Sequence, residues 1–192
     1  MDFAEWRQSV DACRACHLRD GCRGVVIDRG NPRSHVMLVG EAPGESEDEQ
    51  GRPFVGRAGM LLDELLAGAG FSEENVYITN VVKCRPPGNR TPVDDEVQAC
   101  VPHLRKQFLF IRPRIIVALG AVAARALIAP DFRITKEHGH WFEKKGVAMM
   151  AVYHPAFVLR DPGRKPELAA DLALVRERYH ALVSASGTGL AG

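Results

Sequence analysis

The sequence predicts an α/β fold of three layers, in which a central, mostly parallel sheet of four strands lies between two layers of helices. Short apolar runs alternate along the chain with longer segments of helical periodicity. The runs are almost continuously apolar, which is typical of parallel strands that are buried on both faces. A length of 192 residues suits one domain with a sizeable core. We therefore expect residues 1–192 to form a single domain.

Each expected element has its own signal in the sequence. Four apolar runs bounded by turn residues predict strands at residues 36–40, 76–80, 115–119 and 149–153. The segments between and after them predict helices at residues 59–68, 92–110, 120–128 and 166–183. The first of these helices carries leucines at helical spacing, and the second begins with three carboxylates, which favour a helix N-terminus. The small residues at 184–192 are expected to fray.

The composition excludes two broad classes of protein. Hydrophobic residues make up 46% of the chain, which is too much for a disordered tail. Lys and Arg number 25 against 24 Asp and Glu, so the formal charge is only +1. This near balance excludes a uniformly basic nucleic-acid binder but leaves a local basic groove open.

The chain shows no targeting or membrane segment that we recognise. Its N-terminus lacks the charged-then-apolar pattern of a secretory signal. The longest apolar run covers residues 115–124, which is shorter than the roughly 20 residues that a membrane-spanning helix needs. We therefore expect a soluble protein of the cytoplasm that does not contact membranes.

Polar residues stand at the ends of three predicted strands. Gly40 and Glu41 end the first strand, Asn80 ends the second, and His154 follows the fourth. Because the carboxyl ends of parallel strands share one edge of the sheet, where ligands bind in such folds, this edge is the predicted site. The glycines of residues 40–44 match neither common phosphate-binding motif, so an ordinary turn with an exposed Glu41 is the alternative.

The five cysteines predict a metal site rather than disulfides, because their number is odd and no export signal is present. Cys13 and Cys16 form a CxxC pair, and Cys84 and Cys100 form a second pair with fifteen residues between them. Four thiolates suit either zinc or an iron–sulfur cluster, and Cys22 is left over.

Two other interpretations of the cysteines are open at this point. All five could be reduced and partly buried. Alternatively, Cys13 to His17 matches the CxxCH pattern of c-type haem attachment. Haem attachment normally needs export, and it would leave Cys84 and Cys100 unexplained.

Taken together, these motifs resemble the family 4 uracil-DNA glycosylases. Residues 40–45 and 51–59 resemble the family's first motif, residues 77–87 its second and residues 154–156 its last. The two cysteine pairs match the ligands of its iron–sulfur cluster. The resemblance runs from about Cys13 to Tyr179, with the motifs in the family's order.

The resemblance implies a uracil-DNA glycosylase-like fold and a monofunctional DNA glycosylase. Such an enzyme flips uracil out of DNA and hydrolyses its N-glycosidic bond, which leaves an abasic site for base excision repair. It also implies a structural [4Fe–4S] cluster, held by Cys13, Cys16, Cys84 and Cys100. Lyase activity is not expected, because no motif places a lysine for a Schiff base.

The resemblance also assigns roles to the residues at the edge of the sheet. Phe54 is expected to stack on the flipped base, and Asn80 to read it through its amide. His154 is expected to donate a hydrogen bond to the departing uracil, helped by main-chain N–H groups of Gly40, Glu41 and Ala42. The carboxylate of Glu41 would hold the attacking water, or instead orient the base. From each residue alone, a core phenylalanine, an asparagine in a turn and a structural histidine are equally open.

Weaker expectations concern thymine and DNA. By analogy with the family, Glu47 would crowd the C5 position of the base and exclude the methyl group of thymine. Basic residues near the second and last motifs, as well as an apolar one, are candidate DNA contacts: Lys83, Arg85, Arg90, Leu159, Arg160, Arg164 and Lys165. Leu159 or one of its neighbours, Val158 and Arg160, would fill the gap left by the base.

The expected partner is uracil-containing DNA, single- or double-stranded, bound by a monomer, and the sequence leaves contacts with a sliding clamp or other repair proteins open. Two rival functions remain. One is a relative that traps uracil DNA covalently through a histidine soon after the second motif, but residues 85–92 contain no histidine. The other is a cluster-containing module that binds DNA or a protein without catalysis.

Overall fold

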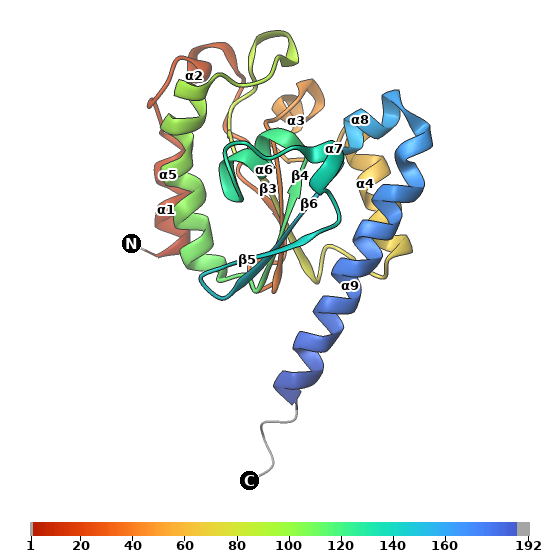
Figure 1. Ribbon diagram of the computed structural model, residues 1–192. Coiled ribbons are helices and arrows are strands. Elements are labelled where there is room, and N and C mark those ends of the chain that lie inside the picture. The colour runs from red at the N-terminus through yellow and green to blue at the C-terminus, as the bar shows by residue number, and fades with distance from the viewer. Residues whose placement is uncertain (1, 188–192) are drawn as a thin grey trace.

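The computed structural model describes residues 2–187, which are built around one mixed sheet of six strands in the order β1-β3-β2-β4-β6-β5 (Figure 1). The four central strands are parallel, as predicted: β3 (Val76–Asn80), β2 (Val36–Gly40), β4 (Ile115–Leu119) and β6 (Val147–Val152). Every residue of the first three is buried, which explains their continuous apolar pattern.

The prediction of four strands was incomplete, because an antiparallel strand is added at each edge of the sheet. β1 (Arg29–Gly30) has only two residues and no apolar run that could reveal it. β5 (Trp141–Lys144) is half exposed and pairs with β6 as a hairpin. Lys145 and Gly146, which connect them, both have positive φ, as a two-residue hairpin turn with the twist of the strands requires.

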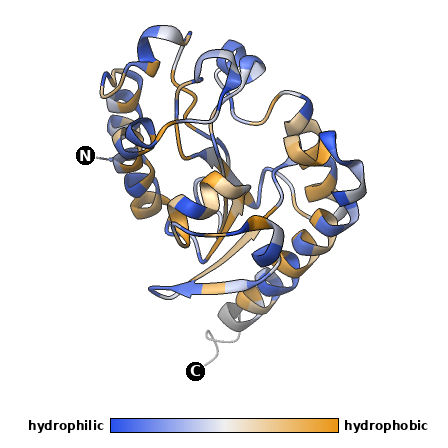
Figure 2. Ribbon diagram, turned by 45° about the horizontal axis from the view of Figure 1, so that its top comes forward, coloured by the Kyte–Doolittle hydropathy of each residue, from blue (hydrophilic) through white to orange (hydrophobic). Residues whose placement is uncertain are grey.

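Helices cover both faces of the sheet, so the predicted three-layer α/β/α class is confirmed. One face packs against α4 (Arg57–Gly68) and α9 (Lys165–Gly187). The other packs against α5 (Asp94–Ile111) and α6 (Ala121–Leu127). In Figure 2 the hydrophobic colour gathers on the central strands, whereas the helices mix both colours.

The four helices above are those predicted from the sequence, and short ones that were not predicted complete the fold. They are α1 (Phe3–Asp11), α2 (Leu18–Gly21), α3 (Glu45–Gln50), α7 (Ile134–Glu137) and α8 (Pro155–Arg160), with 3-10 turns η1 (Pro87–Asn89) and η2 (Pro162–Arg164). Of the tail predicted to fray, residues 184–187 continue α9, and residues 188–192 lie outside the described residues. Between residues 2 and 187, no helix has both the length and the apolar character that crossing a bilayer requires.

The register of the sheet brings the predicted site residues to one edge. Gly40, the last residue of β2, lies level with Asn80, the last residue of β3. β6 ends at Val152, two residues before His154, and runs parallel to both strands across β4. The parallel topology therefore gathers these three segments at the carboxyl edge of the sheet.

Candidate active site

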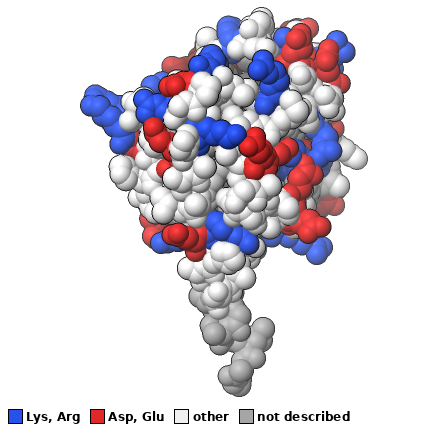
Figure 3. Space-filling model, turned by 90° about the vertical axis from the view of Figure 1, so that its right-hand side faces the viewer, with Lys and Arg blue, Asp and Glu red and all other residues white. Residues whose placement is uncertain are grey.

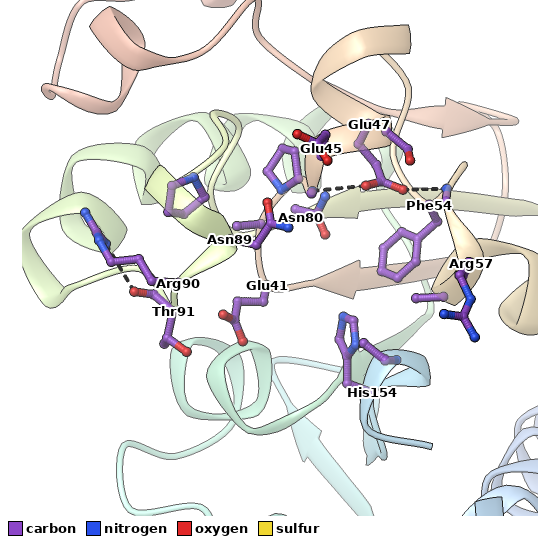
Figure 4. A pocket seen from close by; sticks show the side chains of 18 of the residues that line it. Glu41, Glu45, Glu47, Phe54, Arg57, Asn80, Asn89, Arg90, Thr91 and His154 are labelled. Carbon is purple, nitrogen blue, oxygen red and sulfur yellow. Dashed lines mark hydrogen bonds between the residues drawn. The ribbon is translucent and has the colours of Figure 1, made fainter. Parts of the chain in front are cut away.

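A cavity of about 580 Å³ opens at the carboxyl ends of the parallel strands (Figure 4). Its lining includes Glu41, Glu47, Phe54, Asn80 and His154. These residues come from five separate parts of the chain: the loop after β2, helix α3, the loop before α4, the end of β3 and the start of α8. The structure thus places the predicted site residues around one cavity.

The ring of Phe54 is held in place by an unusual backbone. Phe54 has φ of 56°, in the left-handed region that residues with a side chain rarely adopt. A Cβ on Gly59 would overlap the carbonyl of Phe54, so only glycine lets α4 approach this turn so closely. The ring is 6% exposed, and its centroid lies 5.7 Å from that of His154. Because Phe54 is buried and its backbone is strained, its ring is better explained as one held in place at the cavity than as an ordinary core side chain.

Glu47 acts as a clamp between two loops. One carboxylate oxygen accepts the N–H of Gly44 at 3.0 Å, and the other accepts those of Val55 and Gly56 at 2.9 and 2.7 Å. In Figure 4, dashed lines on both sides of the Glu47 carboxylate mark its hydrogen bonds to lining residues, close to the Phe54 ring. Glu47 therefore ties the loop after β2 to the turn that carries Phe54, a role that the sequence did not suggest.

Asn80 carries a free acceptor in the interior. Its side chain is 1% exposed, and within the described residues its Oδ1 has no hydrogen-bond partner. Gly40 makes the room beside it, because a Cβ there would overlap this oxygen and come within 2.5 Å of the Phe54 ring. An unpaired buried acceptor is costly in free energy, so its presence in the cavity points to a ligand that donates a hydrogen bond.

The imidazole of His154 is neutral and fixed in one tautomer. Burial and, to a smaller extent, the nearby positive charge of Arg160 lower the pKa of His154 to about 4, although Glu47 opposes this shift. Nδ1 accepts the N–H of Ala156 at 3.1 Å, where the side chain also caps α8. Because Nδ1 is an acceptor in a neutral ring, Nε2 carries the proton and is the donor.

Glu41 lies on the Thr91 side of the cavity, with His154 across from it (Figure 4). Burial raises the pKa of Glu41, while a hydrogen bond from the Thr91 side chain and the positive charge of Arg160 lower it. The carboxylate is therefore half-buried and held by a neutral donor instead of a salt bridge. The sequence did not single out Thr91, because it contributes through a loop fifty residues away from Glu41.

The prediction that Lys83 contacts DNA was wrong. The side chain is 1% exposed, and its ammonium donates to acceptors in the core. A lysine in this position cannot reach a phosphate. Burial lowers its pKa to about 8, which the neighbouring Cys100 and Asp28 partly offset.

The other basic candidates near the second motif are tied to carboxylates. Arg85 donates to Glu45 at 3.2 Å and to Asn89 at 2.7 Å. Arg90 lines the cavity and makes a two-pronged bond to the buried Glu96, which lowers the pKa of Glu96 to about 2.

The candidates near the last motif differ in their exposure and pairing. Arg160 lines the cavity, and Leu159 is 37% exposed, whereas Val158 is buried in the core. Arg164 pairs with Asp161 and Glu167, and Lys165 pairs with Glu64. The face turned to the viewer in Figure 3 accordingly mixes positive and negative side chains instead of showing one sign. Because Val158 is buried, it cannot be the side chain that fills the gap left in DNA by the flipped base.

The four cysteines expected to bind a cluster line one small cavity of about 20 Å³: Cys13, Cys16, Cys84 and Cys100. Cys22 lies beside Cys84, outside the lining of this cavity. Main-chain N–H groups point at two of the sulfurs, from Ala15 to Cys13 at 3.4 Å and from Lys83 to Cys100 at 3.3 Å.

This donor set fits an iron–sulfur cluster. Sulfur atoms around an apolar cavity, with N–H groups aimed at them, are what a thiolate-bound cluster needs. Burial raises the pKa of both Cys84 and Cys100. Among residues 2–187, no three His, Cys, Asp or Glu side chains are arranged to hold a metal ion. The four cysteines that line this cavity are the residues that would hold the cluster implied by the sequence motifs.

The ring of Phe54, the amide of Asn80 and the neutral imidazole of His154 line one cavity at the carboxyl edge of a three-layer α/β/α fold, where folds of this class bind small ligands. The family model described as the uracil DNA glycosylase superfamily matches residues 27–176. The chain belongs to this superfamily. The match confirms the fold class implied by the sequence motifs.

Individual relatives show which uracil-DNA glycosylases the chain resembles. The chain is 43% identical over 185 residues to a protein of Pyrobaculum aerophilum named Type-4 uracil-DNA glycosylase, with 91% of this chain and 93% of the relative covered. It is 47% identical over 158 residues to the Type-4 uracil-DNA glycosylase of Thermotoga maritima, covering 80% and 81%. To a Type-5 uracil-DNA glycosylase of Thermus thermophilus it is 32% identical over 192 residues, covering 80% and 87%. The predicted resemblance to family 4 is therefore confirmed.

Proposed function

We propose that this protein is a uracil-DNA glycosylase of DNA repair, which hydrolyses the N-glycosidic bond of uracil and leaves an abasic site. The observation that carries the proposal is the unpaired Oδ1 of Asn80, buried in a cavity with Phe54 and His154. The names of the type-4 relatives support the same function.

The depth of the site requires that the base leave the duplex. A base stacked inside DNA cannot reach a buried amide, so the nucleotide must be flipped into the cavity. The ring of Phe54 then offers an aromatic face on which the base stacks. Its strained backbone holds the ring in place before DNA arrives, so little ordering remains at the moment of binding.

Asn80 distinguishes uracil from cytosine through hydrogen bonds. Its Oδ1 accepts the N3–H of uracil, and its Nδ2 donates to O4. Cytosine has an acceptor at N3 and a donor at N4, so both contacts would become repulsive. A site built to pair a buried polar group rejects such an analogue strongly, because its own polar atoms stay unpaired.

His154 stabilises the leaving group. When the N-glycosidic bond breaks, its electron pair stays on the base, and negative charge develops at O2. The Nε2–H of the neutral imidazole donates to O2, and main-chain N–H groups of Gly40, Glu41 and Ala42 add to this stabilisation. A fixed donor in a water-poor cavity is worth several kcal/mol in comparable sites.

Glu41 acts on the sugar. The sugar gains positive charge as the bond breaks, and the carboxylate of Glu41 both stabilises this charge and holds the attacking water. The water oxygen bonds to C1′ and passes its proton to the carboxylate. Burial raises the pKa of Glu41, and a hydrogen bond from Thr91 and the positive charge of Arg160 offset part of this rise.

Among the described residues, the lining of the cavity offers no lysine amine for a Schiff base, which supports a monofunctional glycosylase over one with lyase activity. For grip on DNA, Arg160, which lines the cavity, and the exposed Leu159, which precedes it in the chain, are the best placed of the predicted contacts. Exclusion of thymine by Glu47 remains a prediction beside the clamping role described above.

Cys13, Cys16, Cys84 and Cys100 would hold a [4Fe–4S] cluster. When bound, the cluster supplies a structural cross-link and no step of the cleavage. Cys13 and Cys16 precede the sheet, Cys84 follows β3 and Cys100 lies in α5, so the cross-link would join the N-terminal segment to the loop after β3 and to α5.

The test is cleavage of end-labelled DNA that holds one uracil, followed by alkali and a denaturing gel. Alkali-dependent cleavage at the uracil is expected for the wild type. We expect E41Q, N80A and H154A to lower the single-turnover rate by at least a hundredfold while their folds persist. Wild-type rates in all three variants would instead support a binding module, and a protein–DNA band that survives denaturation would support covalent trapping.

A further inference from the structure

A second cavity, of about 390 Å³, lies between α4 and α8, next to the cavity proposed for uracil. α4 supplies Arg57, Met60 and Leu61 to its lining, and α8 supplies Val158 and Leu159. The two helices pack against each other, and Figure 1 shows them side by side. We call this second cavity the side groove, and the proposed chemistry makes no use of it.

The side groove is lined by exposed apolar side chains from two helices. Met60 of α4 is 62% exposed, and Leu159 of α8 is 37% exposed. Two further lining residues, Leu61 and Val158, belong to the buried core, so the groove has one firm wall. Single exposed apolar side chains are common on protein surfaces, but a pair from separate helices around one groove is typical of a binding surface.

The side groove adjoins the uracil cavity at Arg57, which lines both. In Figure 4, Arg57 lies on the side of Phe54 and His154, away from Thr91. Helix α8 also contributes residues to both linings. A DNA strand whose base enters the uracil cavity on this side would therefore pass Arg57 before it reaches the groove.

Arg57 offers a positive charge at the junction of the two cavities. Its side chain is exposed, and among residues 2–187 no hydrogen bond or ion pair holds its guanidinium. By contrast, Arg90 in the uracil cavity is bound to Glu96, and Lys165 in the groove is bound to Glu64 at 2.8 Å. A guanidinium without a carboxylate partner suits a phosphate, which it can bind through two N–H groups.

We propose that the side groove binds the nucleotide next to the flipped uracil in the same DNA strand. Arg57 holds the phosphate between the two nucleotides, and Met60 and Leu159 contact the neighbouring base. The shared Arg57 favours DNA over a protein as the occupant, because the strand that delivers uracil must continue past the mouth of its cavity. The proposal rests on the proposed function, since it needs uracil in the first cavity.

The first experiment measures single-turnover cleavage by the cluster-loaded wild type on single-stranded DNA with one internal uracil. One arm replaces the nucleotide on the 5′ side of uracil by an alkali-stable abasic spacer that keeps the phosphate, and a second arm does so on the 3′ side. One of the two spacers should raise the half-saturating enzyme concentration about fivefold, because it removes the base that Met60 and Leu159 contact. That spacer marks the side of uracil that the groove holds.

The second experiment compares R57Q and M60Q with the controls R105Q and L109Q. The controls remove an exposed arginine and an exposed leucine from α5, which covers the opposite face of the sheet. We expect R57Q to raise the half-saturating concentration about tenfold and to lower the slope of log affinity against log salt by about 0.7. M60Q should weaken binding of the intact strand about threefold and shrink the effect of the marking spacer below twofold. Both controls should bind within twofold of the wild type.

Several outcomes contradict the proposal. They are wild-type binding that neither spacer changes, an M60Q protein that keeps the full spacer effect, and an R57Q protein that keeps the wild-type salt slope. If a second copy of the chain covers the groove instead, sedimentation will show a wild-type dimer that M60Q converts to a monomer, and the proposal falls. Should either variant fail to fold, the two spacer arms on the wild type decide alone. A wild type that cleaves none of these strands contradicts the proposed function, and the proposal falls with it.

Discussion

Replacing Gly40 by alanine should separate activity from stability more cleanly than any substitution of a reacting residue. The added Cβ would overlap Asn80 Oδ1 and lie 2.5 Å from Cζ and 2.8 Å from Cε2 of the Phe54 ring. Carbon atoms pack at about 3.5–4.0 Å, so the ring and the amide must each move by roughly 1 Å. Both atoms stand at the free ends of side chains. The strain can therefore relax at a cost of about 1–2 kcal/mol, the lower part of the range for overpacking.

A displacement of this size matters far more to the reaction. A misplacement of about 1 Å commonly lowers a rate by roughly a hundredfold, and here both the stacking ring and the reading amide move. We expect G40A to unfold cooperatively with a loss of about 1–2 kcal/mol, and its single-turnover rate on uracil DNA to fall at least a hundredfold.

The matched control is G68A, near the end of α4, where a Cβ would meet no atom within 4 Å. Alanine should keep full activity there and stabilise the helix by up to about 1 kcal/mol. A G40A protein that cleaves uracil DNA within threefold of the wild type would refute the assignment of this cavity to the base.

Three further predictions concern single carboxylates and the histidine. Because burial raises the pKa of Glu41, the acid limb of the single-turnover rate should lie above pH 4.5, and the residual activity of E41Q should lack this limb in a pH-rate profile. The pKa of His154 is about 4 in the folded protein but near 6.5 in the unfolded chain, so its contribution to stability is complete above pH 6.5 and declines as the pH falls toward 4. Urea unfolding at pH 7, 5.5 and 4.5 should show a smaller decline in H154Q, and an equal decline would count against a buried neutral ring. E47A removes the acceptor of three main-chain N–H groups and should lower the free energy of unfolding by about 3 kcal/mol, whereas a change below about 0.5 kcal/mol would contradict the clamp.

The central strands could be predicted well, and the edges of the sheet could not. β2, β3 and β4 begin and end at the predicted residues, because parallel strands buried on both faces leave a continuous apolar run. β1 and β5 leave no such run, since one has two residues and the other is half exposed. Their positions depend on pairing with β3 and β6, which is a property of the assembled sheet.

In the site, too, the features that depend on a single segment could be predicted, whereas those that depend on the packing of several segments could not. Asn80 and His154 could be placed at one edge because each stands at or just after the end of a parallel strand. Lys83 was misassigned because a lysine is almost never fully buried, and only the packing of β3 against α5 shows that this one is. The role of Glu47 as a clamp was equally hidden, since it depends on two loops that meet only in the folded chain.

The cavity holds a feature that a bound base would relieve, and this leads to a last prediction. Phe54 has a left-handed backbone and Asn80 has an unpaired buried oxygen, and the half-buried ring of His154 lines the same cavity. Uracil would supply an acceptor for the Nε2–H of His154 and a donor for Asn80 Oδ1, which removes the penalty of this unpaired oxygen. Free uracil at a hundred times its dissociation constant should therefore stabilise the protein by about 2.7 kcal/mol, seen as a rise in Tm. Thymine and cytosine at the same concentration should do far less, and N80A should lose the effect of uracil. If cytosine stabilised the wild type as well as uracil does, the amide of Asn80 would not be the reader of the base, even if the cavity were confirmed as the place where the base binds.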